Sequence, residues 1–271
     1  DSNYAQAYNN FGTLLVKLEN IDEAVDLYEK AINLNKDFVE ALVNIGCAKR
    51  LLNKSNEAIE FFKKVIKLKP NHTEAYNFLG VAYYDIGNKE EALENLKKAI
   101  KIKPDYAEAY NHLGVVLRKL TRYDESLASY NKSIELNPNK EDVYNNLGGL
   151  YNNLGKFNKA TQTYKKALEI KPDYALTHSN LLFNINCKQD FDPQEYLREA
   201  KNFRINCKPK KKFSLNYNFE KNPTKLKLGL VSADFGNHPG GFFTLSTLRE
   251  LVKKNFELVA YCTQERSDEF S

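Results

Sequence analysis

The stretch Tyr76–Pro104, YNFLGVAYYDIGNKEEALENLKKAIKIKP, contains the pattern that decides the fold. Its first glycine belongs to a series with a constant spacing of 34 residues: Gly12, Gly46, Gly80, Gly114 and Gly148. An aromatic residue or leucine precedes each glycine by four positions, and a small residue follows it by twelve. Proline closes four of the five units, at Pro70, Pro104, Pro138 and Pro172. A constant period of this length predicts a stack of identical supersecondary units.

The glycines indicate how each unit is built. A glycine within a helix costs about 1 kcal/mol relative to alanine, so five at one register indicate a close approach of two helices. We expect small residues at the facing positions, such as Ala24 and Ala31, to permit that approach. In the quoted unit we predict a helix near 76–86, a turn at Gly87–Asn88 and a helix near 89–101 that Pro104 ends. Stacked pairs bury apolar faces that one pair cannot bury, so the sequence predicts an α-α solenoid with a concave surface.

The pattern divides the chain into three regions. Residues 1–185 contain five 34-residue units and a capping half-unit, whose glycine position holds Leu182. Residues 186–224 are predicted to form a helix opened by Pro193, followed by a linker. Residues 225–271 change character: we predict a strand over 226–233, a loop over 234–241, a helix from Phe242 to about Lys254 and a strand over 256–263. This βαβ order implies a parallel sheet and the start of an α/β domain.

Composition limits the classes of function. The net charge of +5 is spread over lysine-rich surfaces, so we expect no nucleic-acid partner. The four cysteines lack the spacing of a zinc site or a disulfide framework, which favours reduced thiols, a cytoplasmic location and no metal. No apolar run is long enough for a membrane span. The chain contains no methionine and begins at Asp1, so we expect it to be a fragment.

The loop after the first predicted strand is one candidate site. It contains Asp234, Asn237, His238 and Pro239 beside glycines that permit close backbone approach. Loops at the carboxyl ends of strands are where α/β domains place their sites, and a neutral histidine accepts a proton near pH 7. A structural interpretation is equally open, in which His238 only caps the loop ahead of proline.

The first helices of the repeats present a second candidate site. Two positions before the glycine, the repeats have Asn10, Asn44 and Asn146, and Phe78 and His112 interrupt this series. In the half-unit, Asn180 occupies the same position. Four positions earlier it has the carboxylates Glu40, Glu74, Glu108 and Asp142. Residues four apart share one helix face, and a side-chain amide pairs with an extended peptide backbone of any sequence. The pattern therefore favours peptide binding over the alternative that asparagine is a polar filler. His72, His112 and His178 have no metal-ligand spacing, and we expect them on the surface or in the groove.

The combined motifs resemble a known family. The 34-residue units resemble tetratricopeptide (TPR) repeats. The asparagine series, the closing stretch 175–182 (ALTHSNLL) and VSADFGNHP at 231–239 are together similar to protein O-GlcNAc transferases, especially bacterial-type members. The resemblance implies a TPR superhelix followed by the first βαβ unit of a GT-B (Rossmann-like) glycosyltransferase domain.

The resemblance also implies an activity. Its members transfer GlcNAc from UDP-GlcNAc to Ser or Thr of acceptor proteins, with inversion and without a metal or cofactor. His238 would be the catalytic residue, the asparagines and acids would bind acceptor peptides, and the nucleotide sugar would be held mainly by a lobe beyond residue 271. We therefore expect this chain alone to be inactive. Two alternatives remain open: a protein O-fucosyltransferase of the same fold, and a non-catalytic TPR adaptor.

Overall fold

The computed structural model describes residues 2–207, 226–232 and 256–262, and the chain divides into two units, Asp1–Pro209 and Lys210–Ser271. The first unit is helical in its described part, and its helices come in pairs. The first helices of the pairs are α1 (Ser2–Lys17), α3 (Val39–Leu51), α5 (Thr73–Asp85), α7 (Ala107–Lys119), α9 (Glu141–Asn153) and α11 (Ala175–Asn186). The second helices are α2 (Ile21–Leu34), α4 (Ser55–Leu68), α6 (Lys89–Ile102), α8 (Tyr123–Leu136), α10 (Phe157–Ile170) and α12 (Pro193–Asn206).

The predicted close approach at the glycine series is confirmed, but its partner differs from the expected one. A Cβ added at Gly46 would lie 2.6 Å from Phe62, and one added at Gly148 would lie 2.5 Å from Tyr164. The same contact recurs in every unit with the residue sixteen positions later: Tyr28, Phe62, Leu96, Tyr130 and Tyr164. The glycines thus make room for a large side chain of the second helix rather than for the small residues Ala24 and Ala31, although both alanines are fully buried.

The turn between the two helices of a unit repeats with the same backbone geometry. Gly87 has a φ of +84°, and the positions 34 residues before and after it, Asn53 and Thr121, have φ values of +59° and +60°. The backbone N–H of Asn88 donates to the carbonyl of Tyr83 over 2.9 Å, and the equivalent bond closes the turns of the other four 34-residue units. This is the Schellman arrangement, in which one residue takes the left-handed conformation that glycine adopts without strain.

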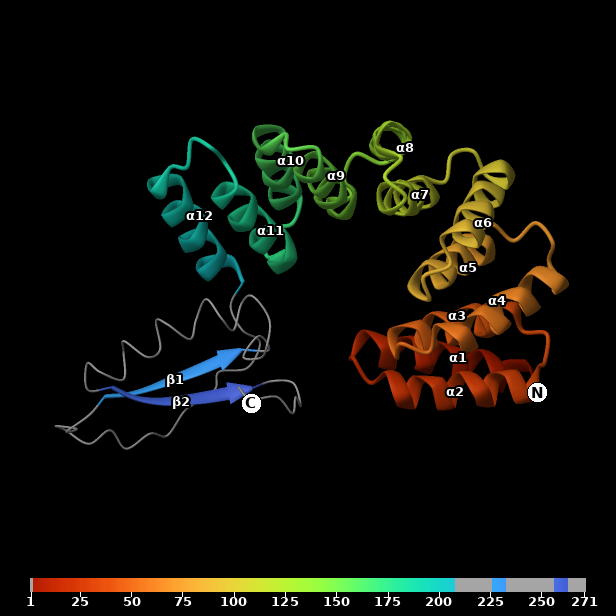
Figure 1. Cartoon of the computed structure of the whole chain (residues 1–271). Coiled ribbons are helices and arrows are strands. Elements are labelled where there is room, and N and C mark those ends of the chain that lie inside the picture. The colour runs from red at the N-terminus through yellow and green to blue at the C-terminus, as the bar shows by residue number, and fades with distance from the viewer. Residues whose placement is uncertain (1, 208–225, 233–255, 263–271) are drawn as a thin grey trace. The chain divides into compact units, whose positions relative to one another are not determined.

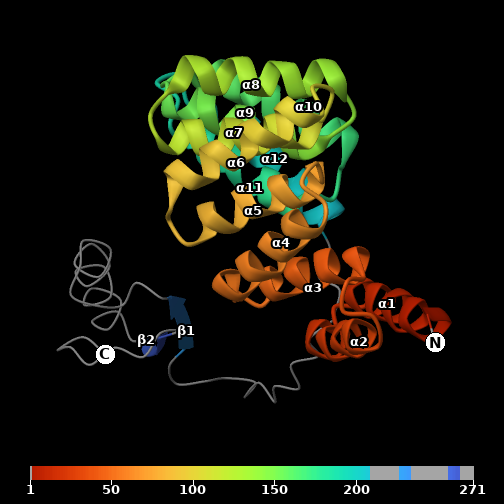
Figure 2. The same cartoon turned by 90° about the vertical axis from the view of Figure 1, so that its right-hand side faces the viewer.

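The pairs stack with their first helices on the inner side of the curve. Each first helix contacts the first helix of the next pair, as α3 contacts α1 and α5, whereas within residues 2–207 no Cα atoms of two second helices approach within 8 Å. Figure 1 shows the pairs following one another along a curved path, and Figure 2 shows the same stack from the side. The first helices therefore line the concave surface.

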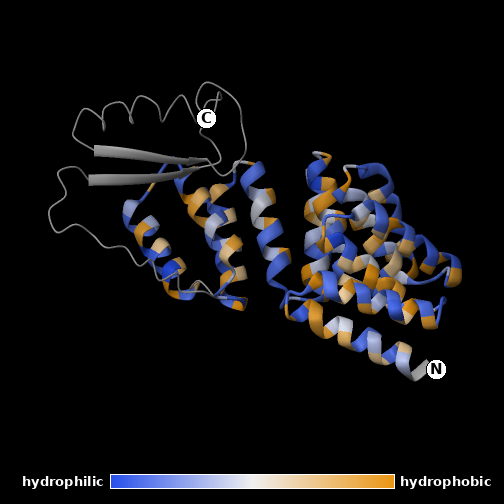
Figure 3. Cartoon of the chain, turned by 90° about the horizontal axis from the view of Figure 1, so that it is seen from below, coloured by the Kyte–Doolittle hydropathy of each residue, from blue (hydrophilic) through white to orange (hydrophobic). Residues whose placement is uncertain are grey.

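The apolar residues form a series of small clusters instead of one core. Tyr28, Phe62, Leu96, Tyr130 and Tyr164 each lie in a different cluster with their neighbours from the same and the next pair. Figure 3 shows that apolar and polar residues alternate along the helices of this unit. Each pair is stabilised by packing between its own two helices and against its neighbours, as in other repeat architectures.

The helix predicted to open at Pro193 is confirmed as α12, and it packs against α11 of the capping half-unit. His178 of α11 is 2% exposed and stacks on Phe203 of α12, with ring centroids 5.3 Å apart and planes 10° from parallel. Its Nε2 donates to the carbonyl of Pro172 over 2.8 Å. The expectation that His178 lies on the surface or in the groove is therefore wrong: it is part of the packing between the last two helices.

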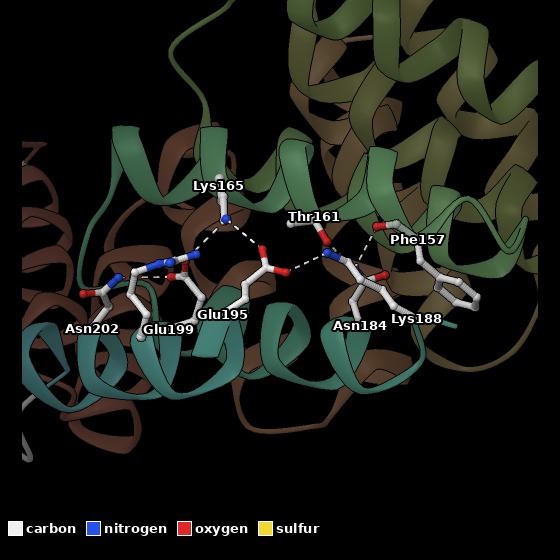
Figure 4. Close-up of polar contacts among 9 residues, drawn as sticks. Phe157, Thr161, Lys165, Asn184, Lys188, Glu195, Glu199 and Asn202 are labelled. Atoms are coloured by element: carbon white, nitrogen blue, oxygen red, sulfur yellow. Dashed lines mark hydrogen bonds and ion pairs between the residues drawn. The ribbon is translucent and has the colours of Figure 1, made fainter. Parts of the chain in front are cut away.

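Charged and amide side chains join α12 and α11 to α10 (Figure 4). Lys165 of α10 reaches Glu195 and Glu199 of α12, at 3.1 and 3.4 Å. Lys188, just after α11, lies 2.9 Å from Glu195, and Asn184 donates to Thr161 Oγ1 over 2.8 Å. The helical unit therefore extends through α12.

In the second unit, the structure describes β1 (Leu226–Ser232) and β2 (Phe256–Cys262). The two strands are parallel, with Leu226 opposite Phe256 and Ser232 opposite Cys262. Strands were predicted at both places. The helix predicted from Phe242 and the loop that contains Asp234, Asn237, His238 and Pro239 lie outside the described residues.

Candidate functional site

The predicted asparagine series lies on the first helices and crosses from pair to pair. We use "ladder" for the position two residues before each glycine: Asn10, Asn44, Phe78, His112, Asn146 and Asn180. Asn10 is exposed, and the other five are half-buried. Because each first helix packs against the next, the ladder runs across the helices that line the concave surface.

A second series, which the sequence analysis missed, supports the ladder from below. We use "inner column" for the position one residue earlier: Asn9, Val43, Asn77, Asn111 and Asn145. Its four asparagines are at most 9% exposed. The signal that could have revealed it is the same 34-residue register, since Asn-Asn occurs at 9–10 and 145–146.

Ladder and inner column are joined by hydrogen bonds between consecutive repeats. Each polar ladder side chain after Asn10 donates to the inner-column Oδ1 that precedes it by 35 residues: Asn44 to Asn9 (2.9 Å), His112 to Asn77 (2.8 Å), Asn146 to Asn111 (3.0 Å) and Asn180 to Asn145 (2.9 Å). An amide carries two N–H donors and one acceptor oxygen, so a ladder asparagine that gives one N–H to this bond retains a donor and an acceptor. The inner column thus orients the amides that face the concave surface.

The structure also explains the interruption at Phe78. Its inner-column counterpart is Val43, so both members of this pair are apolar. The Phe78 ring packs against Phe62, with centroids 5.8 Å apart. A single asparagine at either position would leave a buried amide without its hydrogen-bond partner. This explains why both positions are apolar in this pair, whereas both are polar in the other pairs.

The predicted carboxylates are exposed, and three of the four have polar neighbours. Glu40 accepts a hydrogen bond from Asn9 Nδ2 over 2.8 Å, and Asp142 accepts one from the Tyr174 hydroxyl over 2.6 Å. Glu74 Oε2 lies 3.4 Å from His72 Nδ1. Glu108 is exposed on the first turn of α7. The acids therefore form an acidic border at the start of the first helices.

Two titratable side chains of the first helices, His112 and Cys47, are neutral near pH 7. Burial, with a smaller contribution from Arg50, lowers the pKa of His112 to about 4. Burial raises the pKa of the Cys47 thiol to about 11. A neutral His112 whose Nδ1 faces the Asn77 oxygen carries its proton on Nδ1 and leaves Nε2 as an acceptor. His112 therefore substitutes for an amide in the ladder, because it also offers one donor and one acceptor.

The comparisons with known proteins agree with this architecture. Models described as TPR repeat or Tetratricopeptide repeat match residues 5–38, 39–72, 80–120 and 105–173. The chain belongs to the tetratricopeptide repeat family, whose repeats typically form protein–protein contacts. No curated protein matches the sequence.

Solved structures show the same helical architecture. A thermophilic TPR protein of Thermus thermophilus is 26% identical, with a TM-score of 0.63 over 67% of this chain and 99% of that one. The Cut9–Hcn1 hetero-tetramer of APC/C (18% identity, TM-score 0.67, 74% and 40% covered) and Pseudomonas aeruginosa PilF (19%, 0.60, 75% and 90%) share the fold.

Within the described residues, no three His, Cys, Asp or Glu side chains gather as ligands for a metal ion. No helix there is long and apolar enough to cross a bilayer.

Proposed function

We propose that the helical unit binds an extended segment of a partner protein along the ladder. The observation that carries this proposal is the hydrogen bonding of Asn44, Asn146 and Asn180 to the inner column, which fixes their orientation. Asn146 and Asn180 each keep a donor and an acceptor, and Asn44 keeps its acceptor, since its amide N–H groups also reach Thr13 Oγ1 over 3.5 Å. An extended peptide backbone offers the complementary acceptor and donor at every residue. Preorganised amides bind with less loss of side-chain entropy, which favours affinity.

Recognition of this kind depends on the peptide backbone more than on its side chains. A short fluorescein-labelled Ser/Thr-rich peptide should bind to the 271-residue chain in a fluorescence-anisotropy titration. A version with its backbone N-methylated should bind at least about tenfold more weakly, because each lost hydrogen bond contributes about 1 kcal/mol. A sequence-scrambled version should bind equally well.

Matched variants test the place of binding. Asn10→Ala and Asn146→Ala should each weaken binding, whereas Asn158→Ala, which removes an exposed asparagine from the second helix α10, should not. Equal affinities for all three variants would exclude the ladder as the binding surface.

Transfer of a sugar to the bound segment is our second candidate function. It rests on the resemblance of VSADFGNHP at 231–239 to protein O-GlcNAc transferases, and it is supported by the parallel pairing of β1 and β2, which a βαβ unit requires. In this proposal His238 acts at the acceptor hydroxyl, beside Asp234, Asn237 and Pro239. A GDP-fucose-dependent enzyme and a non-catalytic adaptor are the competing possibilities.

The full gene product distinguishes these possibilities. It should be incubated with an acceptor peptide and either UDP-GlcNAc or GDP-fucose, and the peptide mass followed. A gain of one N-acetylhexosamine that His238→Ala abolishes without changing peptide affinity supports O-GlcNAc transfer. A gain of one deoxyhexose supports fucosyl transfer, and an unchanged mass with intact peptide binding supports the adaptor.

A further inference from the structure

Phe78, the apolar residue of the ladder, and its inner-column counterpart Val43 line a groove. The groove has a volume of about 540 Å³ and lies between the first turns of α3 and α5. Val43 and Phe78 line it, together with Phe38 and Val39. All four are half-buried, so each presents part of its apolar surface to the groove.

The wall of this groove is held in place by the core. Phe78 packs against Phe62, which is fully buried beneath Gly46. The ring therefore cannot turn inward to fill the core, and it cannot move outward without losing that contact. The groove is a feature of the packed structure.

The border of the groove is acidic. Asp37, Glu40 and Glu74 line it, whereas Lys69 is the only lysine or arginine among its described lining residues. His72 does not neutralise Glu74, because its Nδ1 accepts the backbone N–H of Ala75 over 3.2 Å and so has no proton to give to the carboxylate. The excess of carboxylates favours a cationic neighbour to whatever enters the groove.

We infer that this groove is a side-chain specificity subsite within the peptide-binding face, and that it takes a large apolar side chain flanked by Lys or Arg in a bound extended segment. This inference rests on the proposed peptide binding. At the four other pairs the ladder reads the backbone without regard to sequence, whereas here an apolar pair replaces the polar one. The break therefore fixes the register of the bound segment: its apolar residue enters the groove and its basic neighbours face Glu40 and Glu74.

The test uses three short fluorescein-labelled peptides that differ at the centre: Ser-Thr-Lys-Phe-Lys-Thr-Ser, the same with Ser for Phe, and the same with Glu for both Lys. The 271-residue chain should bind the first about tenfold more tightly than the second, because burying a phenylalanine ring removes apolar surface from water. The third should bind more weakly than the first, by a factor that shrinks at high salt.

The double variant Val43→Asn/Phe78→Asn locates the preference. It installs the amide pair that three other repeat junctions already hold, so we expect the fold to be retained, which circular dichroism checks. The preference for the Phe peptide over the Ser peptide should disappear, while affinity for the Ser peptide is kept or increased. Asn158→Ala, which changes an exposed residue of the second helix α10, is the control and should leave the preference for the Phe peptide intact.

The outcomes separate the two levels of the proposal. If the wild-type chain binds the Phe and Ser peptides equally, the subsite is excluded but peptide binding stands. If none of the peptides binds, both fail. If the preference survives in the double variant, the subsite lies elsewhere and the inference is overturned. Self-association of the chain that the double variant abolishes, seen by analytical ultracentrifugation, would show that a second copy covers the groove, and it too would overturn the inference.

Discussion

Asn180 of α11 donates an amide N–H to Asn145 Oδ1 of α9 over 2.9 Å, and the same oxygen accepts the hydroxyl of Thr177 over 3.0 Å. Asn145 is 7% exposed and Thr177 is fully buried. One buried acceptor therefore joins two repeats and orients one residue of the ladder. The consequence is that stability and ligand binding are separable at this pair, because the inner residue supports the packing and the outer residue faces the concave surface.

Replacing the inner residue tests this division. Asn145→Leu removes the acceptor and leaves two donors unsatisfied, one of them the buried Thr177 hydroxyl, so we expect a loss of about 1–3 kcal/mol in unfolding free energy. Asn180→Ala leaves Asn145 bonded to Thr177 and should cost less than about 1 kcal/mol while weakening peptide binding. Urea unfolding followed by circular dichroism measures both. Equal destabilisation by the two variants would contradict the division.

Two adjacent glycines of α9 should respond oppositely to alanine. A Cβ at Gly148 would lie 2.5 Å from the Tyr164 ring, whereas a Cβ at Gly149 would meet only the end of the flexible Arg118 side chain, at 2.8 Å. Alanine gains about 1 kcal/mol of helix propensity at either position, but overpacking against a buried ring costs about 1–3 kcal/mol. Gly148→Ala should therefore lower the melting temperature, and Gly149→Ala should maintain or raise it. A stable Gly148→Ala variant would show that the tight packing is not required.

Thr121 has a conformation that its side chain disfavours. Its φ is +60°, at the position where the previous and following repeats have Gly87 and Gly155. A β-branched residue in the left-handed region costs about 1–2 kcal/mol. Thr121→Gly should therefore raise stability by about 1 kcal/mol, and the reciprocal Gly87→Thr should lower it by a similar amount, as measured by thermal unfolding. An unchanged melting temperature in both variants would mean that the turn does not store this strain.

The sequence allowed the repeat period, the helix pairs and the positions of both strands to be predicted, because these depend on regular spacing. Other features depend on contacts that spacing does not report. The helix predicted from Tyr76 begins at Thr73, since His72 caps it by accepting the Ala75 N–H, and histidine is not a common cap. The contact of His178 with Phe203 joins residues outside the repeat register.

The candidate site was predicted in part for a similar reason. The ladder and acids were identifiable from their recurrence on one helix face. The inner column recurs in the same register, but its role was not identifiable, because a buried asparagine and an exposed one look alike in a sequence. Residues 35 positions apart bond to each other across repeats, and at Val43 and Phe78 both members of such a pair are apolar. This joint replacement is the sign that the asparagines form pairs and are not polar filler. It can be recognised only once the bonded partners are known.

His112 should make stability depend on pH within a defined window. Its pKa is about 4 in the folded chain, below the ordinary value of 6.5, so between these values the unfolded chain binds a proton that the folded chain excludes. The stabilisation is complete above about pH 6.5 and is lost as pH falls toward 4, by at most about 3 kcal/mol, since His112 is only half-buried.

A variant without the titrating ring isolates this contribution. His112→Asn keeps a donor to Asn77, so its stability should fall less than that of the wild type between about pH 6.5 and 4.5. Several carboxylates have pKa values lowered below 4.5 by lysine, arginine or backbone partners, and they lose their contributions mainly below this range: Glu57, Glu125, Glu141 and Glu195. Urea unfolding at several pH values gives the slope for each protein, and parallel slopes would show that the fold does not hold His112 neutral.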